Sequence, residues 1–159
     1  MTYGRAALRA APLLVVLALL AAGLMQSAHA MRHETLKLIT AGGTQVIDVE
    51  VTETPAERAQ GLMFRTRLAD NAGMLFFYET PQEITMWMRN TYIPLDMVFI
   101  RADGVVHRIE ARTEPLSENI VASRGDVTAC LELAGGAAER LGLKPGDRVE
   151  HPFFKPAKK

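Results

Sequence analysis

Short runs of alternating apolar and polar residues make up most of the chain, and glycine-containing turns separate them. Runs rich in β-branched and aromatic residues at a period of two are typical of strands. Two of the turns, Gly42-Gly43 and Asp103-Gly104, carry the two-residue signal of a tight hairpin. The pattern predicts strands over residues 36–40, 45–51, 74–78, 84–88, 95–102, 105–110, 129–133 and 148–150. Their spacing is typical of a small barrel or sandwich.

Two short helices interrupt the predicted strands. Thr54 and Glu57 have the spacing of a capping box, Pro55 suits the first helical position, and Gly61 suits the end of the helix. The second predicted helix covers 136–141 and precedes the last strand. We therefore expect a mainly β protein, with a compact, barrel-like, antiparallel β domain and two short helices.

The first thirty residues have the features of a secretory signal peptide. Arg5 and Arg9 precede an apolar run over 11–24, and Ala28-His29-Ala30 is an A-x-A cleavage site. The run is shorter than the ~20 residues that span a bilayer, although an uncleaved membrane anchor is the alternative. We expect cleavage after Ala30, a periplasmic or secreted protein, one β-rich domain over 31–154, and a mobile tail over 155–159.

Charge and cysteine content restrict the function classes further. The chain has 18 basic and 18 acidic residues; the leader holds two of the basic ones, so residues 31–159 carry 16 − 18 = −2 with histidines neutral. No basic stripe is present to neutralise phosphates, which argues against a nucleic-acid partner. Cys130 is the one cysteine and lies in an apolar run, so we expect a buried thiol and no internal disulfide.

Four sequence blocks support a family resemblance. They cover 57–65, 73–77, 87–96 and 131–133 with 146–149, and include Trp87-Met88-Arg89-Asn90-Thr91 and Ile93-Pro94-Leu95-Asp96. In order and spacing these blocks closely resemble the domain of unknown function 192 family over roughly residues 36–152. The resemblance implies a compact, β-rich, barrel-like single domain that is often exported in bacteria. It implies no established activity.

The segment from Met86 to Asp96 is the strongest candidate for a binding site. It combines the only tryptophan of the chain with short polar side chains inside an apolar run. An indole next to amide and hydroxyl groups is the usual composition of a small-molecule pocket, although Trp87 as a core anchor is the alternative. We expect a small ligand or a cell-envelope partner to bind here. The candidate ligand-binding residues are Trp87, Met88, Asn90, Thr91, Asp96 and Arg65.

Two acidic residues in apolar strands are candidate catalytic groups. Asp96 starts a strand that is apolar on both faces, so it needs a partner, and Arg65 or Arg58 is the partner we expect. Glu132 lies in the strand of Cys130. If Asp96 and Glu132 faced each other across a pocket, they could serve as the acid and base of a hydrolase. A satisfied buried pair is the structural alternative for Asp96.

Other functions stay open as alternatives. Thioethers bind copper(I), and Met86 and Met88 would share one strand face, so a periplasmic copper-handling protein is one alternative. A purely structural accessory protein is another. Phosphate-binding loops, nucleophile elbows and zinc-protease motifs are missing from the sequence, so it favours a binding protein over an enzyme and indicates no cofactor.

Overall fold

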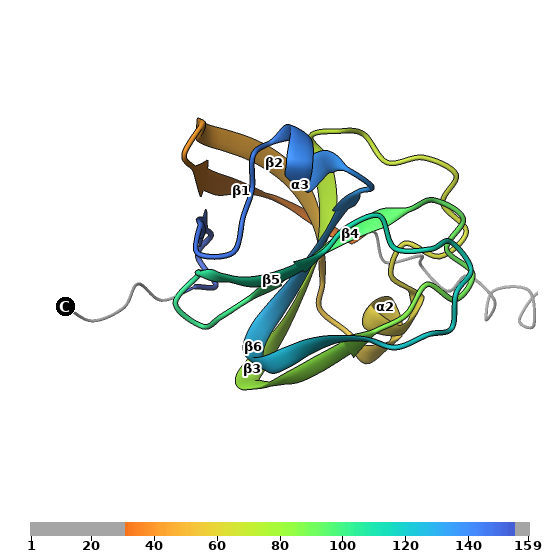
Figure 1. Ribbon diagram of the computed structural model, residues 1–159. Helices are drawn as coiled ribbons and strands as arrows, with labels where there is room; N and C mark the ends of the chain where they lie inside the picture. Colours follow the sequence, from red (N-terminus) through yellow and green to blue (C-terminus); the bar gives the residue numbers. More distant parts are fainter. Residues whose placement is uncertain (1–30, 155–159) are drawn as a thin grey trace, which may run out of the picture. The chain divides into compact units, whose positions relative to one another are not determined.

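The computed structural model describes residues 31–154 (Figure 1). The predicted signal peptide, its cleavage site and the predicted mobile tail lie outside the described residues. Within 31–154, no helix is both long and apolar enough to cross a membrane. The described elements are β1 (Arg32–Thr40), β2 (Gly43–Thr52), α2 (Pro55–Gln60), β3 (Ala72–Met86), β4 (Leu95–Ile100), β5 (Val106–Glu110), β6 (Val121–Ala134), α3 (Ala137–Arg140) and β7 (Arg148–Glu150).

The strands form one barrel-like sheet in the order β5-β4-β6-β3-β2-β1-β7, which confirms the predicted mainly β fold with two short helices. Both predicted hairpins are present as the antiparallel pairs β1–β2 and β4–β5. The two edges of the sheet meet through backbone hydrogen bonds, Val106 N to Asp147 O at 2.8 Å and Val149 N to Gly104 O at 2.7 Å. Edge pairing of this kind leaves fewer exposed backbone groups.

One pair of strands, β2 and β3, is parallel. Parallel neighbours need a long crossover connection, because the chain must return to the starting end of the sheet. Here the connection is the segment between Thr52 and Ala72, which contains α2. The crossover therefore places α2 beside the sheet, next to β3 and β6 (Figure 1).

The longest strands join segments that the sequence pattern separates. The predicted strands 74–78 and 84–88 are parts of the single strand β3, which ends at Met86. Its pairing with β6 shifts register between Phe77 and Gln82, where an irregularity interrupts the ladder. Such irregularities bend a strand without ending it. The polar residues in the middle of β3 were therefore predicted as a loop between two strands, although they continue one strand.

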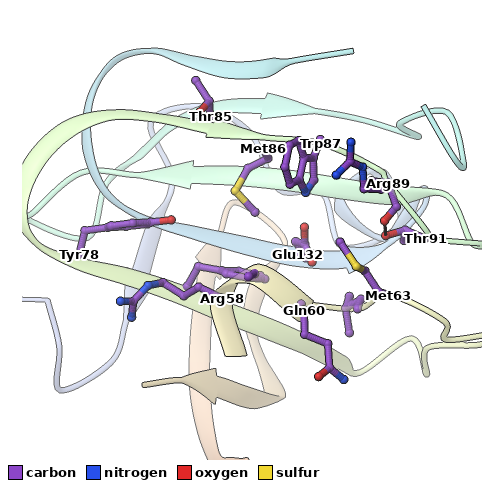
Figure 2. A pocket seen from close by; sticks show the side chains of 14 residues that line it. Arg58, Gln60, Met63, Tyr78, Thr85, Met86, Trp87, Arg89, Thr91 and Glu132 are labelled. Atoms are coloured by element: carbon purple, nitrogen blue, oxygen red, sulfur yellow. Dashed lines mark hydrogen bonds between the residues drawn. The ribbon is translucent and has the colours of Figure 1, made fainter. Parts of the chain in front are cut away.

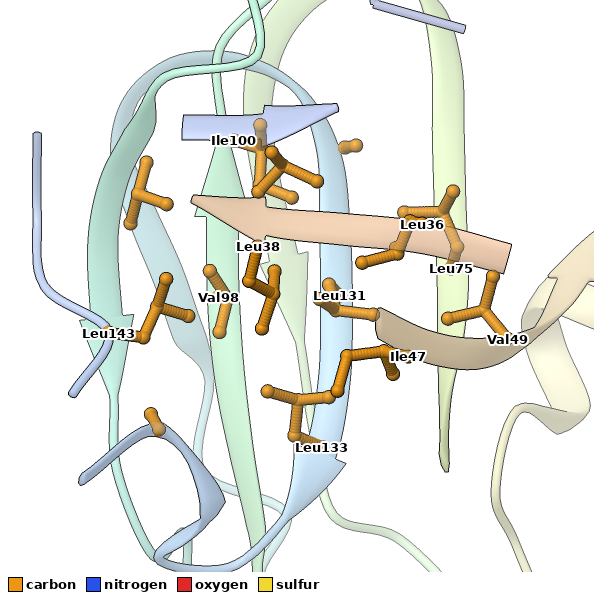
Figure 3. Close-up of a cluster of buried hydrophobic side chains, with 14 of the residues drawn as sticks. Leu36, Leu38, Ile47, Val49, Leu75, Val98, Ile100, Leu131, Leu133 and Leu143 are labelled. Carbon is orange, nitrogen blue, oxygen red and sulfur yellow. The ribbon is translucent and has the colours of Figure 1, made fainter. Parts of the chain in front are cut away.

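Two apolar clusters pack on the two faces of the sheet. The first contains Leu38, Ile47, Val98 and Leu131, and Figure 3 shows β1 and β2 side chains meeting those of β4 and β6. The second contains Met74, Phe76, Met88, Met97, Phe99 and Cys130. Since successive strand residues point to opposite faces, β4 and β6 contribute to both clusters, and β4 is buried along its whole length. Cys130 is buried, as predicted.

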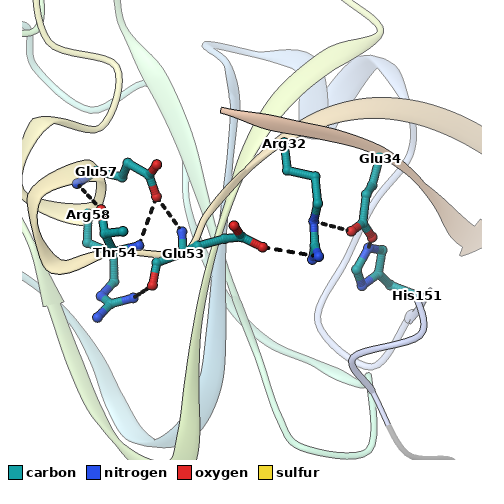
Figure 4. Close-up of polar contacts among 7 residues, drawn as sticks. All are labelled: Arg32, Glu34, Glu53, Thr54, Glu57, Arg58 and His151. Carbon is teal, nitrogen blue, oxygen red and sulfur yellow. Dashed lines mark hydrogen bonds and ion pairs between the residues drawn. The ribbon is translucent and has the colours of Figure 1, made fainter. Parts of the chain in front are cut away.

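The predicted capping box fixes the start of α2. The Thr54 hydroxyl accepts from Glu57 N at 3.1 Å, and the Glu57 carboxylate accepts from Thr54 N at 2.8 Å (Figure 4). Arg58 donates to the Glu53 carbonyl at 3.2 Å. These contacts hold six-residue α2 in place although none of its residues is fully buried.

Candidate functional site

A cavity of about 250 Å³ opens between α2, β3 and the C-terminal part of β6 (Figure 2). Its wall comes from three parts of the chain that are distant in sequence: the α2 segment, β3 with the residues after it, and β6. The lining residues are Arg58, Ala59, Gln60, Gly61, Leu62, Met63, Phe76, Tyr78, Thr85, Met86, Trp87, Arg89, Thr91 and Glu132.

Glu132 is the most unusual group in this cavity. It is only 4% exposed, and its neighbours across the sheet are Met74 on β3 and Met97 on β4, both fully buried. Within residues 31–154 its side chain makes no hydrogen bond or ion pair. Burial raises the pKa of Glu132 to about 8, because desolvation opposes the charged form. The carboxyl group is therefore mostly protonated at neutral pH, and its polar atoms face the cavity.

Trp87 forms one wall of the cavity. It is 42% exposed, so it is not a core anchor. The guanidinium carbon of Arg89 lies 4.8 Å from the centre of the indole ring, and Arg89 pairs with Glu118 at 3.1 Å. Stacking of a guanidinium on an indole holds both groups in a defined position. The ring therefore presents a flat surface at the entrance of the cavity.

Tyr78 and Arg58 lie on the opposite side of Glu132 from Arg89, as Figure 2 shows. The Arg58 guanidinium carbon lies 5.8 Å from the centre of the Tyr78 ring. Burial is the main cause that raises the pKa of Tyr78, and Cys130 and Glu132 add to it. The phenol therefore stays neutral at physiological pH.

Gly61 allows the chain to turn from α2 into the cavity wall. It has φ 49° and ψ −136°, and an added Cβ would lie 3.2 Å from the Phe76 ring. A side chain at this position would be strained, since L-residues rarely adopt this conformation. The turn brings Met63 to the cavity, where its thioether shares the lining with that of Met86.

Asp96 lies elsewhere, and its expected pairing with Arg65 or Arg58 is wrong. The Asp96 carboxylate accepts hydrogen bonds from the backbone amides of Arg112 at 2.8 Å, Gly136 at 2.9 Å and Ala138 at 2.8 Å. These amides satisfy the buried charge without a cation. Arg65 instead forms a two-point ion pair with Glu50, at 2.7 and 2.6 Å.

The expected carboxylate pair of Asp96 and Glu132 is not formed either. Met97 is the residue of β4 directly opposite Glu132, and Asp96 is opposite Leu133. Since neighbouring residues on a strand point to opposite faces, the two carboxyl groups leave the sheet on opposite sides. They cannot act together on one substrate.

The other candidates divide between the cavity and its surroundings. Thr91 lines the cavity and is 4% exposed; its hydroxyl donates to the Arg89 carbonyl at 3.3 Å. Asn90 is exposed outside the lining, with its amide 3.9 Å from the Met63 sulfur. Met88 is buried in the second apolar cluster, where its sulfur accepts from the Thr113 hydroxyl at 3.1 Å.

Met86 and Met88, the methionine pair considered for copper, belong to the same apolar cluster: Met88 is buried in it, and the partly buried Met86 packs against it and lines the cavity. Strand β3 ends at Met86, so the expected alternation along one strand does not extend to Met88. In the described part of the chain, no group of three or more His, Cys, Asp or Glu side chains is placed to hold a metal ion.

Several lining residues escaped the sequence reasoning. Arg58, Met63, Tyr78 and Arg89 line the cavity, yet none of them was a candidate for the binding site. The only available signal was that Arg58 and Met63 lie in the same family block and that Arg89 lies two residues after Trp87.

Comparisons with known proteins support a family assignment and show no activity. A protein from Sinorhizobium meliloti 1021, provisionally described as a transcription regulator, is 45% identical over 76% of this chain and 95% of that chain, with a TM-score of 0.74. A protein of unknown function from Novosphingobium aromaticivorans DSM 12444 is 42% identical over 79% of this chain and 89% of that chain, with a TM-score of 0.75. None of the curated proteins matches. The sequence profile of DUF192, described as "Uncharacterized ACR", matches residues 37–151. The chain belongs to the domain of unknown function 192 family.

Proposed function

We propose that this protein is an exported binding protein that holds a small, largely apolar organic molecule in the cavity beside Glu132. The observation that carries the proposal is the carboxyl group of Glu132, which is buried, faces the cavity and has no partner within residues 31–154. Because the carboxyl faces the cavity, solvent or a bound molecule has to supply its hydrogen-bond partner. A ligand with a matching polar group replaces solvent there and is held in a defined orientation.

The rest of the lining supports an organic ligand. Trp87, Tyr78 and Phe76 contribute aromatic surface, and Met63 and Met86 contribute adaptable thioethers. Apolar walls with a few convergent polar groups are the common composition of small-molecule sites. A cavity of about 250 Å³ suits a small ligand.

The hydrolase and copper alternatives receive less support. Glu132 is the only carboxylate among the lining residues of the described chain, so a second acid for hydrolysis would have to come from the substrate or from elsewhere. The lining holds two thioethers, from Met63 and Met86, without a histidine or cysteine beside them. A partner protein remains the alternative that uses the exposed apolar side chains of Phe64, Tyr92 and Leu116.

Export is part of the proposal and rests on the sequence of residues 1–30. The full chain, expressed with its leader in a host that exports it, is expected to begin at Met31 when the envelope fraction is sequenced from the N-terminus. Recovery of a chain that begins at Met1 or Thr2 would contradict the proposed export and leave the cavity proposal unaffected.

Native mass spectrometry of the same preparation tests ligand binding. We expect a reproducible extra mass that is lost in Trp87→Ala and Glu132→Leu and retained in Tyr92→Ala. Tyr92 is a suitable control because it is an exposed aromatic residue, 49% exposed, outside the cavity lining. Circular dichroism must first show that each variant is folded. An extra mass that survives both cavity substitutions would place the ligand elsewhere and overturn the proposal.

A further inference from the structure

We infer that the molecule bound in this cavity is uncharged and presents a hydrogen-bond acceptor, such as a carbonyl or amide oxygen, to the buried carboxyl of Glu132. The inference rests on the proposed function and names the class of ligand for that site. It begins from geometry: the Glu132 carboxyl is buried between the methionines at 74 and 97, faces the cavity, and has no protein partner among the described residues.

The protonated carboxyl can donate one hydrogen bond and accept others. Burial raises the pKa of Glu132 to about 8, so the donor form dominates at neutral pH. The two neighbours of Glu132 in the sheet are methionines, whose sulfurs are weak acceptors, and neither of them hydrogen-bonds to Glu132. The acceptor has to come from the bound molecule or from solvent.

A cationic ligand is disfavoured by the charges around the cavity. Two arginines, Arg58 and Arg89, belong to its lining. Glu118 forms an ion pair with Arg89 and not with Arg58. Arg58 forms no ion pair within residues 31–154 and donates to a backbone carbonyl. A cation at Glu132 would also require that carboxyl to ionise, which its burial opposes.

An anionic ligand group at Glu132 is disfavoured by the same burial. Desolvation is the cause of the raised pKa of Glu132, and neither lining arginine pairs with this carboxyl. A ligand carboxylate placed against Glu132 would lose its hydration in the same way. An uncharged carbonyl or amide accepts the hydrogen bond without this cost.

Glu132 is also the group that titrates in the cavity near neutral pH. The other titratable or charged groups that face it are Cys130 on its own strand, Tyr78 on β3, Arg58 on α2 and Arg89 after β3. The pKa of Cys130 and that of Tyr78 are raised, mainly by burial, so both groups stay neutral as Glu132 ionises.

The test uses the single tryptophan of the chain, Trp87, as a fluorescent reporter in the cavity wall. Three probes share a phenyl ring and differ in charge: phenylacetamide is uncharged, phenylacetate is an anion, and benzyltrimethylammonium is a permanent cation. We expect phenylacetamide to bind at least tenfold more tightly than either ion at about pH 6. Its Kd should rise roughly 30-fold by about pH 9.5, as Glu132 loses its proton.

Two variants show whether Glu132 is responsible. Glu132→Gln retains a hydrogen-bond donor that does not titrate, so phenylacetamide should still bind and its Kd should no longer depend on pH. Asp126→Asn removes an exposed acid from the same strand and should leave the pH dependence unchanged.

The outcomes separate the inference from the proposed function. Tighter binding of either ion than of phenylacetamide, lost in Glu132→Leu, would overturn the inference while supporting a ligand site in this cavity. A phenylacetamide affinity that rises with pH would also overturn it. If none of the probes changes Trp87 fluorescence and the native protein carries no extra mass, the proposed function fails, and the inference fails with it.

Discussion

Asp96 and Glu132 are buried acids on the adjacent strands β4 and β6, and their side chains leave the sheet on opposite faces. Three backbone amides satisfy Asp96, whereas no protein group among the described residues satisfies Glu132. Two of those amides, from Gly136 and Ala138, belong to the start of α3, so Asp96 fixes this turn against β4. One acid therefore has a structural explanation, and the other is available to a ligand.

Removal of the Asp96 carboxylate should destabilise the fold strongly. In Asp96→Ala, the amides of Arg112, Gly136 and Ala138 lose their acceptor, two of them in buried contacts. We expect a loss of about 3–5 kcal/mol in the free energy of unfolding, measured by urea denaturation. Asp96→Asn keeps one acceptor oxygen and should lose less. Asp48→Asn, a change at an exposed acid of β2, should stay within about 0.5 kcal/mol of the parent.

Stability should fall as pH rises because of Glu132. Its pKa is raised from 4.5 to about 8 in the folded protein, so the folded state holds a proton that the unfolded state releases above about pH 4.5. The stabilisation is complete below pH 4.5 and is lost as pH rises through about 8.

Comparison with Glu132→Gln isolates this effect. The glutamine variant cannot titrate at this position, so its stability relative to the parent should improve by a few kcal/mol between about pH 5 and pH 9. Urea denaturation at several pH values measures the difference. A constant difference across this range would show that Glu132 has an ordinary pKa.

The conformation of Gly61 should be essential to the shape of the cavity. Gly61→Ala places a Cβ 3.2 Å from the Phe76 ring in a backbone conformation that suits glycine, so we expect a loss of about 1–3 kcal/mol in stability. Gly142→Ala is the matched control, because Gly142 also has positive φ but nothing lies within 4 Å of the added Cβ. Its cost should be about 1 kcal/mol. Equal costs for the two variants would contradict the role of the Phe76 contact.

The ion pair of Arg65 and Glu50 joins the segment after α2 to β2 through two parallel hydrogen bonds. Arg65→Lys retains the charge but cannot make the two-point contact, so it should lower the unfolding free energy by about 1 kcal/mol. The pair is partly exposed, with the Arg65 side chain 38% accessible, so the effect should shrink in high salt. Thermal denaturation at low and high NaCl measures it, with Arg67→Lys as the exposed control.

A second ionisable contact joins β1 to the residue that follows β7. The Nε2 atom of His151 lies 2.7 Å from Glu34, which also pairs with Arg32 at 2.6 Å (Figure 4). The His151 side chain is 3% exposed, so Glu34→Ala would leave it buried without its partner. We expect faster amide hydrogen exchange in β7 of this variant, and little change in Arg32→Ala.

Local patterns in the sequence were sufficient for the features that depend on neighbouring residues. The hairpins at Gly42-Gly43 and Asp103-Gly104 were predicted because turn chemistry acts within a few positions. The capping box of Thr54 and Glu57 was predicted for the same reason. The burial of Cys130 followed from the apolar residues around it.

The candidate site depended on contacts that no local pattern contains. Trp87 and Glu132 were candidates, but their common cavity exists because the β2–β3 crossover places α2 beside β3 and β6. The sequence correctly placed Asp96 in a buried strand, yet its amide partners come from residues 112–138, far along the chain. A buried acid requires a hydrogen-bond partner. Which group becomes that partner depends on how the strands pair and on where the crossover connection runs. Residue type alone determined that need, and only the tertiary structure decided that Asp96 is satisfied and Glu132 is not.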